Sequence, residues 1–516
     1  MIRYTNSIKT EGPHGIPVKI ECSVSKGIGI HVVGICDAAV KEGLLRTVTA
    51  LQAEDYTIPG QKIIINFSPN DLQEKSCRYD LATALSIIAA TGQVQLDNLE
   101  KFIILGELGL DASVRMTDAC IQAIETAKSN RIESVIIPRD NAQEIAPLLN
   151  TAFSGETHIY AVSTLKEAVD VVKKNGIDEL RAETVYEMAR NDGKGLKEKW
   201  TKPWDKLAGN EGLKRAITIA AAGGHGMLLV GPPGTDKNTA AKALCSLLPP
   251  MTQKETVEVA EIYSAAGQTQ RFGEKSKKRP YREAHPINGL RALLGGGSGN
   301  NILPGEVSLA HNGVLFIDNV VEVPKAMLES LRGPMEDKKV TIARLKTRVS
   351  YKADFVPVFA SHPCPCGWHG SGDRCNCTPN QRWAYLHHLS GPVMDRVVVQ
   401  TYINPVVLGN AIPGTPFREA VDSVRNAREM QAKRYNNLPG VTNDNVPSDE
   451  FIKKMKLQPE AGELAERLME QMQLNVKNYM MILRIARTIA DIYQSEEILP
   501  PHVAEASSYR FLDRLV

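Results

Sequence analysis

Hydrophobic and polar positions divide the chain into regions with different patterns. In residues 1–170, short apolar runs alternate with segments of helical periodicity. The runs at 62–67, 102–105 and 135–138 predict strands, and the pattern over 79–91 predicts a helix. Strands and helices in alternation predict an α/β or α+β domain for this region.

The second region, 203–405, contains continuous apolar runs, of which 227–230 and 314–317 are the clearest. Such runs are typical of strands that are buried on both faces of a parallel sheet. The charged, helix-prone segment 171–202 predicts a linker, and the helical pattern of 411–516 predicts a small helical domain. The chain is therefore expected to be a multidomain α/β protein.

Composition adds few constraints to this picture. The chain has 516 residues, with 61 Lys and Arg against 59 Asp and Glu, so its formal net charge is +2. Such a total neither indicates nor excludes nucleic-acid binding, because a basic groove can be hidden within it. The sequence has no apolar run of the length that spans a membrane and no apolar core of a secretory signal near residue 1. We therefore expect a cytoplasmic protein without membrane association.

A glycine-rich turn follows the strand predicted at 227–230 and precedes a helical pattern over 240–248. The turn reads Gly231-Pro232-Pro233-Gly234-Thr235-Asp236-Lys237-Asn238-Thr239. Strand, glycine-rich turn and helix are the context that a phosphate-binding P-loop requires. Backbone N–H groups at the helix start would point at phosphate oxygens, and Lys237 would supply a cation for the β- and γ-phosphates.

The motif departs from the standard one on both sides of its lysine. Asp236 stands where glycine is usual, and Asn238 stands where Ser or Thr is usual. A carboxylate ~5 Å from a phosphate charge, at an effective dielectric of ~20, is repelled by roughly 3 kcal/mol, or about a hundredfold in affinity. Asn238 lacks the hydroxyl that holds magnesium, and Thr239 is one residue out of register. A glycine-rich turn without any ligand is the alternative interpretation.

An apolar strand that ends in an acid forms the second motif, Val314-Leu315-Phe316-Ile317-Asp318-Asn319. In P-loop proteins an Asp at this place binds magnesium, so we expect that role for Asp318. AAA+ proteins usually follow it with a Glu that activates water, whereas this chain has Asn319, whose amide has no useful basicity. Alone, such a strand end is usually a capped turn; about 80 residues after a P-loop, it indicates a nucleoside-triphosphate fold.

Four of the nine cysteines are clustered as two C-x-C pairs, Cys364, Cys366, Cys375 and Cys377. Four thiolates on a short loop can close a tetrahedral zinc site, and we expect a structural one. Four reduced thiols without metal, or an iron–sulfur cluster, are the alternatives. The other cysteines are scattered and are expected to be buried thiols.

Together these motifs resemble the magnesium-chelatase-like AAA+ ATPases of the ComM, or YifB-like, branch. The matching segments are 67–72, 79–82 and 106–111 in the N-terminal region, and 214–216, 220–225, the P-loop, 304–318, 363–367, 389–392, Asp395 with Arg396, and 486–491 beyond it. The resemblance covers nearly the whole chain. It implies a Lon-protease-like α+β domain over 1–170, a P-loop AAA+ parallel-sheet domain with a zinc-type loop over 203–405, and a helical lid domain over 411–516.

The resemblance also implies an activity. Members of this family are expected to form hexameric rings with ATP and Mg2+ between subunits and to act on DNA as branch-migration helicases during natural transformation. Arg396 would be the arginine finger that reaches a neighbour's γ-phosphate, although an Arg after Asp is commonly part of a surface ion pair. Proteolysis is not implied, because the Lon-like region shows no Ser–Lys dyad signature.

The chain departs from the family at positions that carry chemistry. Besides Asp236, Asn238 and Asn319, His362 replaces the sensor-1 Asn and Lys477 replaces an Arg near the sensor-2 position. The family's Arg-Ala-Pro-His-His stretch becomes Arg-Glu-Ala-His-Pro at 282–286. Packing and cysteine positions remain. The leading hypothesis is therefore a degenerate AAA+ protein that binds ATP weakly and hydrolyses it slowly or not at all.

Three rival hypotheses remain open from the sequence. An active DNA motor would need another acid, for which Glu322 is the nearest candidate. A non-enzymatic DNA-binding or regulatory ring subunit could mix with an intact paralogue, and the basic stretch 275–280 would be either a phosphate contact or, more commonly, a solvated loop. Magnesium insertion into porphyrin is disfavoured by the Lon-like region and the cysteine loop.

Overall fold

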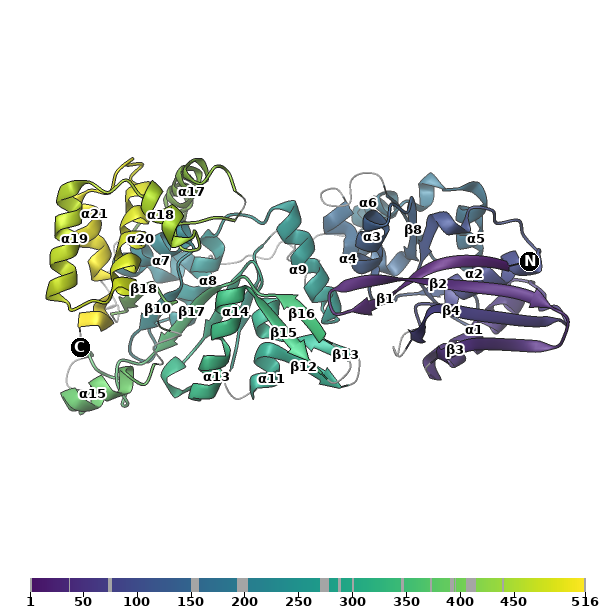
Figure 1. Ribbon diagram of the computed structural model, residues 1–516, viewed down its shortest axis with the longest axis horizontal. Helices are drawn as coiled ribbons and strands as arrows, with labels where there is room; N and C mark the ends of the chain where they lie inside the picture. Colours follow the sequence, from purple (N-terminus) through teal and green to yellow (C-terminus); the bar gives the residue numbers. More distant parts are fainter. Residues whose placement is uncertain are drawn as a thin grey trace.

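A computed structural model describes residues 2–36, 38–72, 77–149, 157–192, 203–269, 278–285, 289–298, 301–344, 348–371, 374–389, 394, 396–404, 414–438 and 440–514. The molecule is elongated (Figure 1), with an N-terminal α/β region at one end and C-terminal helices at the other. A second α/β region lies between them.

The N-terminal region is built on a seven-stranded mixed sheet with the order β3-β4-β2-β1-β5-β8-β9. Its strands are β1 (Ile2–Glu11), β2 (His14–Ser25), β3 (Gly29–Cys36), β4 (Lys62–Leu72), β5 (Phe102–Ile104), β8 (Ser134–Pro138) and β9 (His158–Val162), and a short pair, β6 (Glu107–Leu108) and β7 (Val114–Arg115), lies beside it. The helices are α1 (Ala38–Ala53), α2 (Asp80–Thr91), α3 (Cys120–Ser129), α4 (Ala142–Leu149), α5 (Leu165–Lys174) and α6 (Ala182–Asp192). The strands and the helix predicted for this region are confirmed.

The prediction that 171–202 is a linker was wrong over 171–192. Helix α5 continues to Lys174, and Val171 and Val172 are buried in the core under the sheet. Helix α6 contributes Ala182 and Val185 to the core on the opposite face. Two apolar residues three positions apart suffice to seat one face of a short helix, so the low apolar content did not reveal its packing. Residues 193–202 lie outside the described residues.

The central region has a five-stranded parallel sheet with the order β11-β14-β17-β10-β18. The strands are β10 (Met227–Val230), β11 (Tyr281–Glu283), β14 (Val314–Ile317), β17 (Val356–Ser361) and β18 (Val399–Tyr402), with the hairpins β12 (Gly295–Ser298)–β13 (Asn301–Pro304) and β15 (Lys339–Ala343)–β16 (Arg348–Lys352). The helices are α7 (Glu211–Gly223), α8 (Lys237–Leu247), α9 (Gln253–Ala265), α11 (Gly289–Leu294), α12 (Glu306–Leu309), α13 (Lys325–Ser330), α14 (Arg332–Asp337) and α15 (Pro379–Leu386). The two predicted apolar runs form β10 and β14, and every residue of both strands is buried.

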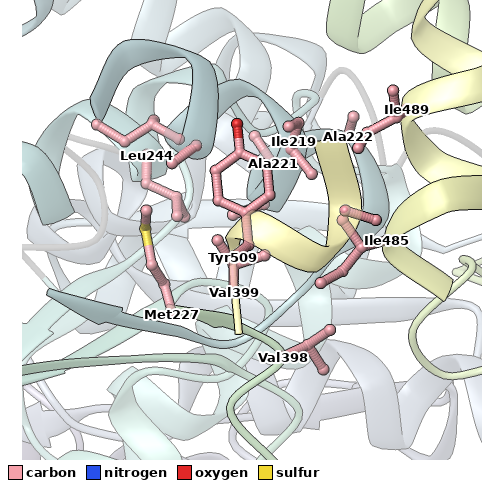
Figure 2. Close-up of a cluster of buried hydrophobic side chains, with 14 of the residues drawn as sticks. Ile219, Ala221, Ala222, Met227, Leu244, Val398, Val399, Ile485, Ile489 and Tyr509 are labelled. Atoms are coloured by element: carbon pink, nitrogen blue, oxygen red, sulfur yellow. The ribbon is translucent and has the colours of Figure 1, made fainter. Parts of the chain in front are cut away.

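The C-terminal region is helical, as its pattern predicted. It comprises α17 (Phe417–Arg434), α18 (Ser448–Lys454), α19 (Pro459–Gln471), α20 (Val476–Ile492) and α21 (Pro500–Ser508). Ile485 and Ile489 of α20 share one buried cluster with Ala222 of α7 and Val399 of β18 (Figure 2). The helical region is therefore packed directly on the central sheet region through a continuous apolar core.

A polar network accompanies this apolar contact. The buried His225 ring lies 3.0 Å from an Asp444 oxygen and 2.8 Å from the Thr488 hydroxyl. Asn443 donates to Asp491, which also accepts from Arg434 at 2.9 Å. These bonds join the loop after α7 to α17 and α20, so they orient the helical region on the sheet region.

Helix α9 joins the central region to the N-terminal region, and Figure 1 shows it between the two sheets. Ala260 and Tyr263 of α9 are buried in the same cluster as Ile121 and Ile124 of α3. The Gln122 amide donates to the Glu261 carbonyl at 3.2 Å and accepts from the Ser264 hydroxyl at 2.9 Å.

Candidate functional site

The glycine-rich turn lies at the carboxyl end of β10, which is flanked by β17 and β18. In open parallel sheets, ligands bind at this edge. The Gly231 N–H donates to the Ser361 carbonyl at 3.1 Å, and the Ile403 N–H donates to the Val230 carbonyl at 2.7 Å. A Cβ on Gly231 would lie 2.8 Å from the Thr235 hydroxyl and 3.0 Å from the Ile403 carbonyl, so any larger residue would have to displace its neighbours.

The second half of the turn has left-handed backbone conformations at Gly234 (φ 79°) and Asp236 (φ 48°, ψ 35°). The Thr235 hydroxyl donates to the Pro232 carbonyl at 2.8 Å and closes the turn. Asp tolerates this conformation better than most residues do. The substitution of Gly by Asp at position 236 therefore preserves the turn before α8 while it adds an exposed negative charge.

Lys237 is the first residue of α8 and is 7% exposed. Its Nζ donates to the carbonyls of Gly231 and Pro232, each at 3.0 Å. Burial lowers the pKa of Lys237, and the nearby Asp318 carboxylate acts in the opposite direction. The cation that the sequence predicted for phosphate binding is thus directed into its own loop, close to the acid that ends β14.

Asn238 is held on both sides by residues of β11. Its Nδ2 donates to Glu283 Oε2 at 2.8 Å, and its Oδ1 accepts from the Tyr281 hydroxyl at 3.2 Å. Tyr281 stacks on Phe316 of β14 with ring centroids 6.4 Å apart. Thr239, the residue that follows, is half-buried in the first turn of α8.

Sequence reasoning missed the parts that Tyr281 and Glu283 play at this site. The one signal in the sequence was the acid at position 283. Its partner could not be found without the fold, because Asn238 and Glu283 are 45 positions apart and meet only through the order of the sheet.

Asp318 and Asn319 follow β14 directly. An Asp318 oxygen accepts from the Asn319 N–H at 2.9 Å, and Asn319 is left-handed (φ 48°, ψ 46°). The Oδ1 atom of Asn319 is buried and has no hydrogen-bond partner. Buried polar atoms without partners are uncommon, and a bound ligand or ion is one explanation for them. An amide cannot accept a proton from water, so this position cannot serve as a general base.

His362 follows β17, the strand that lies between β14 and β10. Its Nδ1 atom is also buried without a hydrogen-bond partner. The structure thus brings Lys237, Asp318, Asn319 and His362 to one edge of the sheet. Lys477 lies in the first turn of α20, and its side chain is exposed.

Glu322, the alternative base, lies on a 3-10 turn after Asn319 and is exposed. Tyr385 of α15 hydrogen-bonds to it, and burial together with this carboxylate raises the pKa of Tyr385 to about 12. Glu322 is therefore engaged by a residue outside the P-loop.

Arg396 lies at the opposite end of the sheet. Its carbonyl would be 2.7 Å from a Cβ on Gly226, which precedes β10, and the Val398 N–H donates to the Gly226 carbonyl. The four residues of β10 separate this end from the P-loop, a length of about 13 Å. The guanidinium pairs with Glu336 of α14 at 2.9 Å and is 40% exposed.

The basic stretch 275–280 is described only from Lys278 onward. Arg279 is half-buried, pairs with Glu255 at 3.1 Å, and donates to the carbonyls of Pro249 and Asn312. This arginine is therefore part of the packing of α9.

The four clustered cysteines converge. All four Sγ atoms lie within 4.8 Å of one another, and Cys364 Sγ is 3.4 Å from Cys366 Sγ and 3.8 Å from Cys375 Sγ. Zinc with four thiolates at about 2.3 Å has sulfur–sulfur distances of about 3.8 Å, so the donor set fits such an ion. A backbone N–H at Trp368 holds the pKa of Cys366 down, at about 6, and thus favours the thiolate that a metal requires.

Among the helices that the structure describes, none combines the length and the apolar character needed to cross a membrane.

Comparisons with known proteins match this arrangement. Residues 204–410 match the model of magnesium chelatase, subunit ChlI; residues 20–141 match subunit ChlI of Mg-chelatase; and residues 417–510 match the ChlI C-terminal model. The P-loop, Asp318 and the four clustered cysteines all fall in the first of these matches.

Full-length relatives agree with the domain matches. The YifB protein of Escherichia coli (strain K12) is 34% identical over 512 residues, 98% of this chain and 96% of that protein. The competence protein ComM of Haemophilus influenzae is 34% identical over 505 residues, 97% of this chain and 95% of that protein. Lon protease 2 of Bacillus subtilis is 26% identical over 181 residues, 34% of this chain and 32% of that protein. The chain therefore belongs to the magnesium chelatase subunit ChlI family, in the group that includes YifB and ComM.

Proposed function

We propose that this chain is a AAA+ nucleotide-binding subunit that assembles into a hexameric ring and hydrolyses ATP weakly or not at all. The observation that carries the proposal is the state of the carboxyl edge of the central sheet. The P-loop turn and its lysine are kept, whereas the position of the general base is Asn319, with a buried amide oxygen that has no partner.

Nucleotide binding rests on the turn from Gly231 to Thr239. When bound, ATP would take its phosphates to the backbone N–H groups at the start of α8 and to Lys237. Lys237 would leave the two carbonyls that it now contacts, at a modest cost, because a charged phosphate is a better partner than a carbonyl. Asp236 adds a like charge beside the phosphates, so the affinity is expected to be low.

Magnesium would be held by Asp318 and would neutralise phosphate charge. Asn238 stands at the position where a hydroxyl normally assists. Because the Asn238 amide is engaged by Glu283 and Tyr281, it must exchange these bonds before it can contribute an oxygen to a metal. This competition supports weak magnesium binding at the site.

Assembly into a ring is supported by the position of Arg396. The finger lies at the end of β10 opposite to its own P-loop, so it could contact only the nucleotide of a neighbouring subunit. In the single chain, Glu336 pairs with the guanidinium at an exposed position. In a ring shared with an intact paralogue, Arg396 would complete the paralogue's active site.

DNA is the partner that we propose for the ring, in recombination during natural transformation. The support is the family relationship to a competence protein at 34% identity over nearly the full length. We also assign the region up to residue 192 to the Lon-like domain, 203–404 to the motor domain with a structural Zn2+ on Cys364, Cys366, Cys375 and Cys377, and 414–514 to the helical lid.

The test is equilibrium binding of a fluorescent ATP analogue with Mg2+, run beside steady-state phosphate release on the same protein. Binding without turnover is the expected result. Turnover comparable to that of an intact AAA+ motor would refute the proposal, and Glu322→Gln would then show whether Glu322 is the substitute base. Absence of binding would leave a DNA-binding or regulatory ring, which salt-dependent DNA binding without ATP would support.

A further inference from the structure

The cysteine loop contacts the P-loop directly. Gly367, between Cys366 and Trp368, has a φ of +80°, and a Cβ placed on it would lie 3.3 Å from Pro233 of the P-loop and 3.6 Å from His362. Only a glycine can keep this backbone conformation and this close approach without displacing its neighbours. The loop that carries two of the thiols therefore packs directly against the P-loop.

The same loop is attached to both of the strands that flank β10, by the chain itself on one side and by a hydrogen bond on the other. On one side it continues from Ser361 of β17, whose carbonyl accepts from the Gly231 N–H. On the other side the Tyr402 hydroxyl of β18 donates to the His369 carbonyl. A Cβ on Gly370 would lie 2.5 Å from that hydroxyl, so the backbone is closely apposed to Tyr402 as well. The loop thus crosses the carboxyl edge of the sheet beside the P-loop.

Few apolar contacts fix the position of the cysteine loop. Among the described loop residues between His362 and α15, only Pro363, Cys364 and Gly367 are buried, and Cys366 is exposed. Besides the Tyr402 bond and a 2.8 Å contact between Arg382 and the His369 ring, the loop is constrained by the convergence of the four Sγ atoms, which joins its start to the residues that precede α15. A metal at this point would close the loop and remove the conformational freedom of its backbone.

We propose that the metal held by Cys364, Cys366, Cys375 and Cys377 sets the affinity of the nucleotide site, because the metal-closed loop positions Pro233 and His362. This inference rests on the proposed nucleotide site and assigns its regulation. Loss of the metal would release Gly367 from its contact with Pro233, so the P-loop would lose the packing that this loop provides. The expected effect is a loss of affinity of about tenfold, the size typical when groups that support a site from behind are removed.

The first experiment measures zinc content and affinity for a fluorescent ATP analogue on the full-length chain. The protein is tested in three states: as purified, after removal of zinc with a chelator that does not bind Mg2+, and after Zn2+ is added back. We expect about one zinc per chain, weaker nucleotide binding after removal, and recovery on readdition. Cys375→Ser/Cys377→Ser should behave as the zinc-free chain does, and Cys22→Ala, outside the cluster, should leave both quantities unchanged.

The second experiment separates metal binding from its effect on the P-loop. Gly367→Ala keeps all four cysteines but places a methyl group against Pro233, so it should retain zinc and weaken nucleotide binding. Gly440→Ala is the matched control, because Gly440 also has a positive φ (+74°) but nothing within 4 Å of its Cβ. Unchanged nucleotide affinity in the zinc-free chain, or the absence of zinc from the purified chain, would overturn the inference. Failure of the zinc-loaded chain to bind nucleotide would instead refute the proposed nucleotide site.

Discussion

Two polar clusters of the central region differ in how their atoms are satisfied. Where the helices join the sheet region, His225, Asp491, Arg434, Asn443 and Thr488 are all connected by hydrogen bonds. The carboxyl edge of the sheet differs. There, the buried Asn319 Oδ1 and His362 Nδ1 atoms of the predicted nucleotide site have no hydrogen-bond partner.

The first cluster fixes how the helices pack on the sheet region, whereas the second lies where we propose that nucleotide binds. The hydrogen bonds of the first cluster specify the geometry of the joint between helices and sheet, even though Arg428 Nε, Thr442 Oγ1 and Arg487 Nε at this joint have no partner. The Asn319 amide oxygen and the His362 Nδ1 atom are buried without a partner, and a bound ligand or ion is one explanation for such atoms.

The largest change is expected from rebuilding the site. The triple variant Asp236→Gly/Asn238→Thr/Asn319→Glu restores the P-loop pattern and supplies a general base, so phosphate release should rise by about 10²–10⁴-fold. Steady-state release with Mg2+ measures it. The same P-loop changes with Asn319→Gln, which cannot accept a proton, are the control. If the control turns over as fast as the triple variant, the missing base is not what limits hydrolysis.

A comparable loss of stability is expected at the joint. Asp491 is fully buried and pairs with both Arg434 and the fully buried Arg487, so Asp491→Ala leaves two guanidinium groups without their carboxylate. Breaking a buried pair in this way costs about 3–5 kcal/mol. Chemical denaturation of the full chain should show an earlier transition.

The surface pair of Lys456 and Glu496 provides the matched control, since its side chains are 60% and 80% exposed. Glu496→Ala should change stability by less than about 1 kcal/mol. Equal effects of the two substitutions would mean that the buried network does not hold the helices.

An intermediate effect is expected from the charge at the P-loop alone. Asp236→Asn removes the carboxylate but keeps a residue that tolerates the left-handed backbone, so it isolates electrostatics from conformation. Affinity for the ATP analogue should rise by up to about a hundredfold. The gain should shrink with added salt, because the charge is exposed. A gain only with Asp236→Gly would show that backbone strain is the cause.

The smallest effect concerns pH at the other joint, between α9 and α3. Burial and the neighbouring Glu125 raise the pKa of Glu261 to about 7, and Glu258 adds to the shift while Lys352 opposes it. The folded chain holds this proton more tightly than the unfolded chain, so the contribution to stability is complete below about pH 4.5 and is lost as pH rises through 7.

Glu261→Gln removes that titration. The variant should gain up to about 2 kcal/mol over the parent at pH 8 and little at pH 5. Unfolding transitions recorded at both pH values test this. Unchanged pH dependence in the variant would assign the effect to other groups, for which Glu258→Gln is the next substitution.

The pattern of apolar positions was sufficient for β10, β14 and α2, because burial on both faces or on one helical face leaves a strong local signal. The P-loop context was readable for the same reason. What could not be read were contacts between distant segments: α6 on its core, Asn238 with Glu283, and Gly367 against Pro233. Each depends on the order of strands in a sheet, which no local pattern encodes.

Arg396 lies at the end of β10 that is remote from its own P-loop, and this placement affects how the protein can evolve. In the ring that we propose, a subunit would contribute Arg396 to a neighbour's site at one end of its sheet and would bind nucleotide at the other end, so either capacity could be lost without the other. Substitutions that weaken nucleotide binding would then leave Arg396 under separate selection. In a mixed ring, such a subunit would lower the number of active sites while the ring stayed closed. The ratio of this subunit to an intact paralogue would then set the ATPase rate of the whole assembly.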